Sequence, residues 1–200
     1  MAAQGTRPTR PVIVGVILEL IMALAGIGTA VALFPVVKRQ NEGVALGFVG
    51  SRVLEAGTIV VCVVSLLTVV TLRRSGAGAD ALVTARALVA FHDWIFLLGQ
   101  GTLPAVNALL LGSLLYRSRL VLRMLPLLGF FGAALLLASV TATLFGLWGQ
   151  VSAMAVLFAL PIAAWEFSLG VYLVVKGFKP SPITAGMATT MQATRPHVAA

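Results

Sequence analysis

Hydrophobic residues fill long runs of this chain, and most polar residues lie in the short stretches between the runs. A helix that crosses a bilayer needs roughly 20 mostly apolar residues. Five runs reach this length, approximately 12–37, 44–72, 82–116, 124–147 and 152–175. The valine-rich part at 56–72 would suit a strand in water, but its length favours a helix. The pattern therefore predicts an all-α fold, a polytopic transmembrane helical bundle with five spans.

The third run, 82–116, is long for one simple span. Polar residues recur in it every seven positions, at Arg86, Asp93, Gln100 and Asn107. On an α-helix this spacing keeps side chains on one stripe, which drifts by only about 20° per heptad. A sixth span would require a break near Gly99 and Gly101. The stripe instead favours one continuous helix with a polar seam, kinked at Pro104.

The segments outside the runs divide the chain into three parts. Residues 1–11 form a short N-terminal segment, and 12–178 form the transmembrane domain. Residues 179–200 are rich in Ser, Thr, Pro and Ala, which predicts a disordered tail. Within the domain, a turn between the last two spans is predicted from Gly149, Gln150 and Ser152, beside Trp148 as an interfacial anchor.

The first run also has features of a signal peptide, since Arg7 and Arg10 precede it and Ala30-Val31-Ala32 resembles a cleavage site. However, the run is longer than a usual signal-peptide core and contains Glu19. We predict a retained helix, with a cleaved signal as the alternative.

Composition agrees with a membrane protein. Hydrophobic residues make up 60% of the chain and charged residues 10%, whereas globular proteins carry about 25% charged residues. The net charge of +8 does not indicate a nucleic-acid partner, because the basic residues occur in small groups between apolar runs. The lone Cys62 excludes an intrachain disulfide.

The basic residues also predict an orientation, because cytoplasmic loops of membrane proteins are enriched in Lys and Arg. With five spans, one side holds Lys38, Arg39, Arg117, Arg119, Arg123, Lys176, Lys179 and Arg195. The other side holds Arg7, Arg10, Arg73, Arg74 and, depending on the span limit, Arg86. This asymmetry predicts a cytoplasmic C-terminus.

Four of the six acidic residues fall within predicted spans, namely Glu19, Glu55, Asp93 and Glu166. An ionised group at the bilayer centre costs at least about 2.5–3.5 kcal/mol, so such residues normally face the bundle interior with a partner. Arg52 lies three residues before Glu55, on the same helix face, and Glu166 reaches a similar depth. We therefore predict that Arg52 pairs with Glu55, Glu166 or both.

A second polar set is predicted in the other half of the bilayer. It comprises Glu19, His92 and Asp93. The stripe predicts that Asp93 points into the bundle toward Glu19, with His92 beside them, and such a site would respond to protons. The alternative is that Asp93 pairs with Arg86 at the interface.

No pattern in the chain indicates catalysis or a bound cofactor. A metal site needs several converging ligands, and the spans contain one histidine. The serines in the spans, Ser65, Ser139 and Ser168, belong to no nucleophile motif. We predict no catalytic residue, metal or cofactor. An intramembrane enzyme that uses His92, Asp93 and Glu19 is the weakest hypothesis.

Four stretches resemble a known family in combination: NEGVALGFVGSRVLEA (41–56), AFHDWIFLLGQG (90–101), LLLGSLLYRSRLV (109–121) and WEFSLGVYLVVKGFKP (165–180). Together they resemble the bacterial membrane-protein family catalogued as domain of unknown function 4386. The resemblance implies a multi-pass protein of the bacterial plasma (inner) membrane and no catalytic residue. Members usually have a further helix before the equivalent of 12–37. Its absence would expose one bundle face, which a homo-oligomer or a partner membrane helix would cover.

Two functions follow from these observations. The favoured one is a non-enzymatic membrane module, a sensor or an accessory subunit, whose polar residues fix helix packing. The alternative is a small-solute or proton/cation-linked transporter, in which the polar seam lines a path. In both, the lipid bilayer is the main partner.

Overall fold

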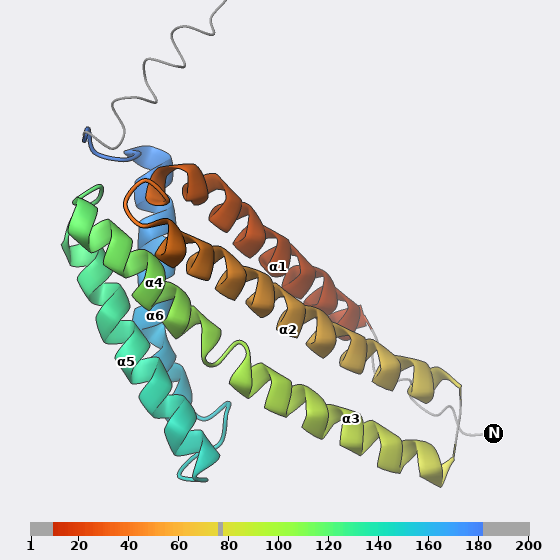
Figure 1. The fold of residues 1–200 in the computed structure, drawn as a ribbon. Helices are drawn as coiled ribbons and strands as arrows, with labels where there is room; N and C mark the ends of the chain where they lie inside the picture. The colour runs from red at the N-terminus through yellow and green to blue at the C-terminus, as the bar shows by residue number, and fades with distance from the viewer. Residues whose placement is uncertain (1–9, 76–77, 182–200) are drawn as a thin grey trace, which may run out of the picture.

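The computed structural model describes residues 10–75 and 78–181, and it is all-α (Figure 1). The helices are α1 (Arg10–Val37), α2 (Glu42–Arg74), α3 (Ala79–Leu98), α4 (Leu103–Ser118), α5 (Met124–Leu144) and α6 (Ala153–Val175). Within the described residues, five segments are long and apolar enough to cross a membrane, with α3 and α4 together forming the third. The predicted bundle of five spans is confirmed.

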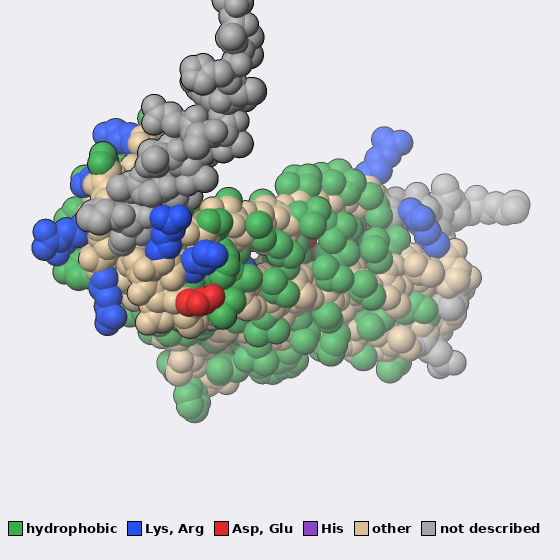
Figure 2. All heavy atoms as spheres, turned by 45° about the horizontal axis from the view of Figure 1, so that its top comes forward, with side chains coloured by type: hydrophobic (Ala, Val, Ile, Leu, Met, Phe, Trp, Pro, Cys, Tyr) green, Lys and Arg blue, Asp and Glu red, His purple; other side chains and the backbone are tan. Residues whose placement is uncertain are grey.

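Successive spans run in opposite directions, so that the connections gather at two ends. One end carries the connections 38–41 and 119–123 and the stretch 176–179, and we call it the basic end. Figure 2 shows Lys and Arg side chains concentrated there, with a mostly apolar surface along the bundle. The opposite end carries the α2–α3 and α5–α6 connections. The α5–α6 connection confirms the predicted turn, and its Ser152 Oγ accepts a hydrogen bond from the backbone N–H of Ala155 at the start of α6.

The third span is interrupted, which corrects the prediction of one continuous helix. Residues 99–102 form a turn between α3 and α4. A Cβ at Gly101 would collide with the carbonyl oxygen of Leu97, so this backbone requires glycine. Pro104 lies in the first turn of α4, where its missing N–H costs nothing, and it does not kink a continuous helix. We predicted a continuous helix because we gave the seven-residue stripe more weight than the low helix propensity of Gly99 and Gly101. In the structure both glycines lie in the turn that separates α3 from α4.

Packing is tightest toward the basic end. The main core joins residues of α1, α2, α4, α5 and α6, and it includes the fully buried Phe48 and Trp165. At Gly132 the backbones of α5 and α6 approach so closely that a Cβ would lie 2.6 Å from the backbone nitrogen of Ile162. By contrast, α3 packs mainly on α2. Toward the opposite end, α5 and α6 diverge from α1, α2 and α3 (Figure 1).

The described chain extends a little beyond the predicted domain boundary. Phe178 packs against the core, and the backbone N–H of Lys179 donates to the carbonyl of Leu120 at 2.8 Å. The start of the predicted tail is therefore held against the basic end. Most of the predicted N-terminal segment, residues 1–9, and the rest of the tail, residues 182–200, lie outside the described residues.

Candidate functional site

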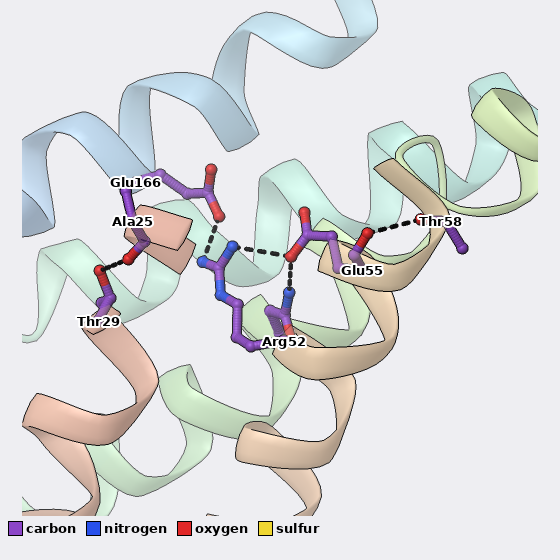
Figure 3. A network of polar contacts seen from close by, with 7 residues as sticks. Ala25, Thr29, Arg52, Glu55, Thr58 and Glu166 are labelled. Carbon is purple, nitrogen blue, oxygen red and sulfur yellow. Dashed lines mark hydrogen bonds and ion pairs between the residues drawn. The ribbon is translucent and has the colours of Figure 1, made fainter. Parts of the chain in front are cut away.

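The most connected polar group in the bundle is centred on Arg52 of α2. Its guanidinium donates from Nη1 to Glu55 Oε2 at 2.9 Å and from Nη2 to Glu166 Oε1 at 2.6 Å (Figure 3). Glu55 lies one turn further along α2, whereas Glu166 comes from α6, 114 positions away in sequence. The predicted ion pairing of Arg52 is confirmed with both partners. The guanidinium also lies 5.8 Å from the ring centre of Phe48, within cation–π range.

Asn107 of α4 completes this Arg52 cluster, which we define as Arg52, Glu55, Asn107 and Glu166. The Asn107 side chain is fully buried, and its Nδ2 donates to Glu55 Oε2 at 2.8 Å. The same carboxylate oxygen therefore accepts from Arg52 and from Asn107. The cluster ties α2, α4 and α6 together with charge-assisted hydrogen bonds, which are stronger than neutral ones.

The Arg52 cluster lies beside a cleft of about 280 Å³ between α1 and α6. These two helices pack on α2 and on α5 respectively and form no packed pair with each other. Arg52, Glu55 and Leu111 contribute to the lining, while Leu33 of α1 and Leu169 of α6 line its flanks. The cleft is therefore an apolar space between two helices, with charged groups on one part of its wall.

The charges at this wall do not balance when all of them are ionised, because two carboxylates share one guanidinium. The side chains of Arg52 and Glu55 are each 12% exposed, whereas that of Glu166 is 37% exposed. In Figure 3 the second oxygen of Glu166 points away from Arg52. The excess negative charge is thus most accessible at Glu166.

A second polar group surrounds Cys62 of α2, closer to the opposite end, and we call it the Cys62 cluster. The thiol lies 3.7 Å from the carbonyl oxygen of His92, and the side chains of Glu19, Asp93 and Gln100 lie near enough to interact with it. His92 Nδ1 and Asp93 Oδ1 are 3.0 Å apart. Three buried atoms of the cluster have no hydrogen-bond partner among the described residues, namely Glu19 Oε2, His92 Nε2 and Gln100 Nε2.

The predicted stripe on the third span does not form one continuous inward seam. Asn107 is buried and Gln100 is partly buried, but Arg86 and Asp93 are exposed. The prediction that Asp93 points into the bundle is wrong, since its side chain is 59% exposed, whereas the predicted position of His92 beside it is confirmed by their pairing. The alternative pairing with Arg86 is also not found among the described ion pairs. The break at 99–102 ends the helical register on which the stripe depended.

Sequence reasoning missed Cys62, Trp165 and the α1 residues that line the cleft. Cys62 could have been found from its spacing, because it lies seven positions after Glu55 and therefore on the same face of α2. The cleft had no such signal, since it depends on how far α1 stands from α6. Among the described residues, no group of three or more His, Cys, Asp and Glu side chains is arranged to hold a metal ion.

The whole bundle corresponds to one known family. Residues 2–177 match the Domain of unknown function (DUF4386). The chain belongs to the DUF4386 family. Both clusters and the cleft lie within the matched DUF4386 region. Comparisons with curated proteins and with solved structures gave no match. The chain is thus a multi-pass membrane protein of a family whose name assigns no function.

Proposed function

We propose that this protein is a non-enzymatic membrane module, most simply a sensor, that binds a positively charged group of a small amphiphile in the cleft between α1 and α6. The observation that carries the proposal is the exposed carboxylate of Glu166 at an otherwise apolar cleft. A cation placed there would neutralise the excess negative charge of the Arg52 cluster. Pairing is favourable in this setting because an uncompensated charge inside the bilayer is costly.

The shape of the cleft supports a small ligand. Its volume of about 280 Å³ lies near the lower limit of about 300 Å³ for typical ligand pockets. The apolar flanks suit a hydrocarbon body, while Glu166 and Thr29 supply polar contacts near the charged wall. If the protein were an accessory subunit, a basic side chain from a partner helix would occupy the cleft instead. That side chain would have to fit into the same narrow space between α1 and α6.

A binding role also suits the distribution of polar groups better than transport does. A path across the membrane needs polar groups that follow one another through the bundle. Here Arg86 and Asp93 are exposed residues of α3, and Arg52, Glu55 and Asn107 are held together by an ion pair and hydrogen bonds. The proposal takes the basic end as cytoplasmic, in line with the excess of Lys and Arg there.

The experiment uses Trp165, which lines the cleft, as a fluorescent reporter. In a variant with Trp94→Phe and Trp148→Phe, Trp165 is the remaining tryptophan of the three in the chain. Titrating the purified protein in nanodiscs with decylammonium should produce a saturable change in its emission. The uncharged match, decanol, should bind at least about tenfold more weakly, because it cannot form a charge-assisted pair.

Glu166→Gln in the same background should weaken decylammonium binding by about tenfold or more. Glu42→Gln is the matched control, because Glu42 is an exposed residue in the first turn of α2 and does not line the cleft. Equal binding of decanol and decylammonium, or unchanged binding by Glu166→Gln, would show that the cleft does not select a positive group.

A further inference from the structure

A second cavity lies at the opposite end of the bundle, in a groove between α2 and α3. Its volume is about 460 Å³, larger than that of the cleft. Its lining combines apolar side chains with two arginines, and includes Val69, Leu72, Arg73, Leu82, Arg86 and Val89. The groove shares no lining residue with the cleft of the Arg52 cluster.

The groove is open because α3 is loosely packed. Its main helix contact is with α2, which leaves its flanks uncovered by other helices. Four of the lining residues on the α3 side are small, namely Gly78, Ala81, Ala85 and Ala90. Larger side chains at these positions would fill the space between the two helices. The small residues therefore leave the space that forms the cavity, and the cavity opens to the molecular surface.

The two arginines give the groove a positive mouth. Arg73 lies in the last turn of α2, where the apolar helix ends, and Arg86 lies two turns into α3. Both are exposed, and neither takes part in an ion pair among the described residues. Asp93 also lines the groove, but it lies seven residues past Arg86, about 10 Å along the helix, and is paired with His92.

We propose that this groove binds an anionic phospholipid, with the phosphate between Arg73 and Arg86 and one acyl chain along Val69, Leu82 and Val89. Guanidinium groups match phosphate oxygens with paired hydrogen bonds. Arg73 lies where α2 leaves its apolar stretch, which is the depth of a lipid headgroup, and Arg86 lies two turns into α3, on the bilayer side of Arg73. The apolar lining continues from there toward the bilayer centre. Basic pockets between transmembrane helices favour anionic headgroups for the same reason.

The opposite charge of the two cavities makes this a separate site. The cleft presents an exposed carboxylate and selects a cation, whereas the groove presents two guanidinium groups at its mouth. Lipid binding in the groove would also cover the flank of α3 that the bundle leaves open. It would thereby hold the α2–α3 hairpin in place at the opposite end.

The test measures thermal unfolding of the detergent-solubilised full chain with added phosphatidylglycerol, phosphatidylcholine or inorganic phosphate. Phosphatidylglycerol should raise the melting temperature of the wild type saturably, and the other two should have little effect. Arg73→Gln and Arg86→Gln should each weaken the apparent affinity about fivefold, and about 25-fold together. Arg74→Gln is the matched control, because Arg74 is the exposed neighbour of Arg73 and does not line the groove.

A second pair of variants tests the acyl chain. Ala85→Leu should fill the groove and abolish the shift caused by phosphatidylglycerol, whereas Ala87→Leu, on an exposed position outside the lining, should retain it. The proposal is overturned if inorganic phosphate or phosphatidylcholine reproduces the shift, if Arg74→Gln is as harmful as Arg73→Gln, or if Ala85→Leu leaves lipid binding unchanged.

Discussion

The Arg52 cluster and the Cys62 cluster both lie between α2 and the α3–α4 segment, but their polar atoms are satisfied to different degrees. In the first, Asn107 is fully buried, Glu55 is 12% exposed, and an arginine joins two carboxylates. In the second, His92 and Asp93 form the one ion pair among the described residues of the cluster, and Asp93 is mostly exposed. The first cluster contains an arginine, whereas His92 is the one basic side chain of the second, so composition explains part of the difference.

The packing of the surrounding helices explains the rest. The Arg52 cluster lies where α2, α4 and α6 come together, and each of these helices supplies a partner. The Cys62 cluster lies where α3 packs mainly on α2, and Asp93 remains exposed there. A charge enclosed by several helices must be paired, whereas one on an open helix face is not enclosed by protein. The comparison teaches that pairing follows enclosure by neighbouring helices.

The largest effect is expected from removing the arginine. Arg52→Leu leaves Glu55 and Glu166 facing each other without a cation, and breaking a buried pair in this way costs about 3–5 kcal/mol. The double variant with Glu166→Leu should recover at least about 1 kcal/mol, because it removes one uncompensated carboxylate. The free energy of unfolding can be measured by titrating the detergent-solubilised protein with SDS. A double variant no more stable than Arg52→Leu would show that these two residues do not compensate each other.

The Arg52 ion pairs could be predicted from the sequence because an unpaired charge in the bilayer is costly, and the same cost stabilises the pairs in the structure. Counting residues from the ends of the runs gave the depths of Arg52 and Glu166, and the cost of a lone charge in lipid required a partner. Asn107 was also proposed as an intramembrane polar residue, although its bond to Glu55 was not foreseen. These features depend on helix geometry within single elements, which is readable from spacing.

The features that sequence reasoning missed depend on tertiary arrangement. At the break, the backbone at Gly101 lies against the carbonyl oxygen of Leu97. A seven-residue pattern of polar positions carries no information about such a contact. The exposure of Asp93 follows from the absence of any helix other than α2 packed extensively on α3. Likewise, the cleft exists because α1 and α6 stand apart, a distance set by packing at other interfaces. Spans were thus predictable, while the spaces between them were not.

A smaller effect is expected at Asn107, and Gln100 offers a matched comparison one heptad earlier. Asn107→Leu removes the hydrogen bond to the buried Glu55 carboxylate, which should lower the free energy of unfolding by about 1–3 kcal/mol. Gln100→Leu should cost much less, because the Gln100 amide lies beside the Cys62 thiol, a weak hydrogen-bond partner, and not beside a carboxylate. The same SDS titration compares the two. Equal losses would contradict the distinction between the enclosed Arg52 cluster and the more open Cys62 cluster.

The smallest effect is expected from Asp93→Asn, which tests the more open Cys62 cluster. The substitution keeps the size of the side chain and removes its charge, so it weakens the contact with His92 without creating a cavity. Because the Asp93 side chain is 59% exposed, solvent and lipid headgroups screen this pair, and exposed ion pairs contribute only about 0–1 kcal/mol. We expect the free energy of unfolding to change by less than about 0.5 kcal/mol. Glu55→Gln, the equivalent change in the Arg52 cluster, should cost more because it leaves Arg52 with Glu166 as its remaining carboxylate. If Asp93→Asn proved as harmful as Glu55→Gln, enclosure by neighbouring helices could not be the factor that separates the two clusters, and Asp93 would have to be held by contacts stronger than its exposure indicates.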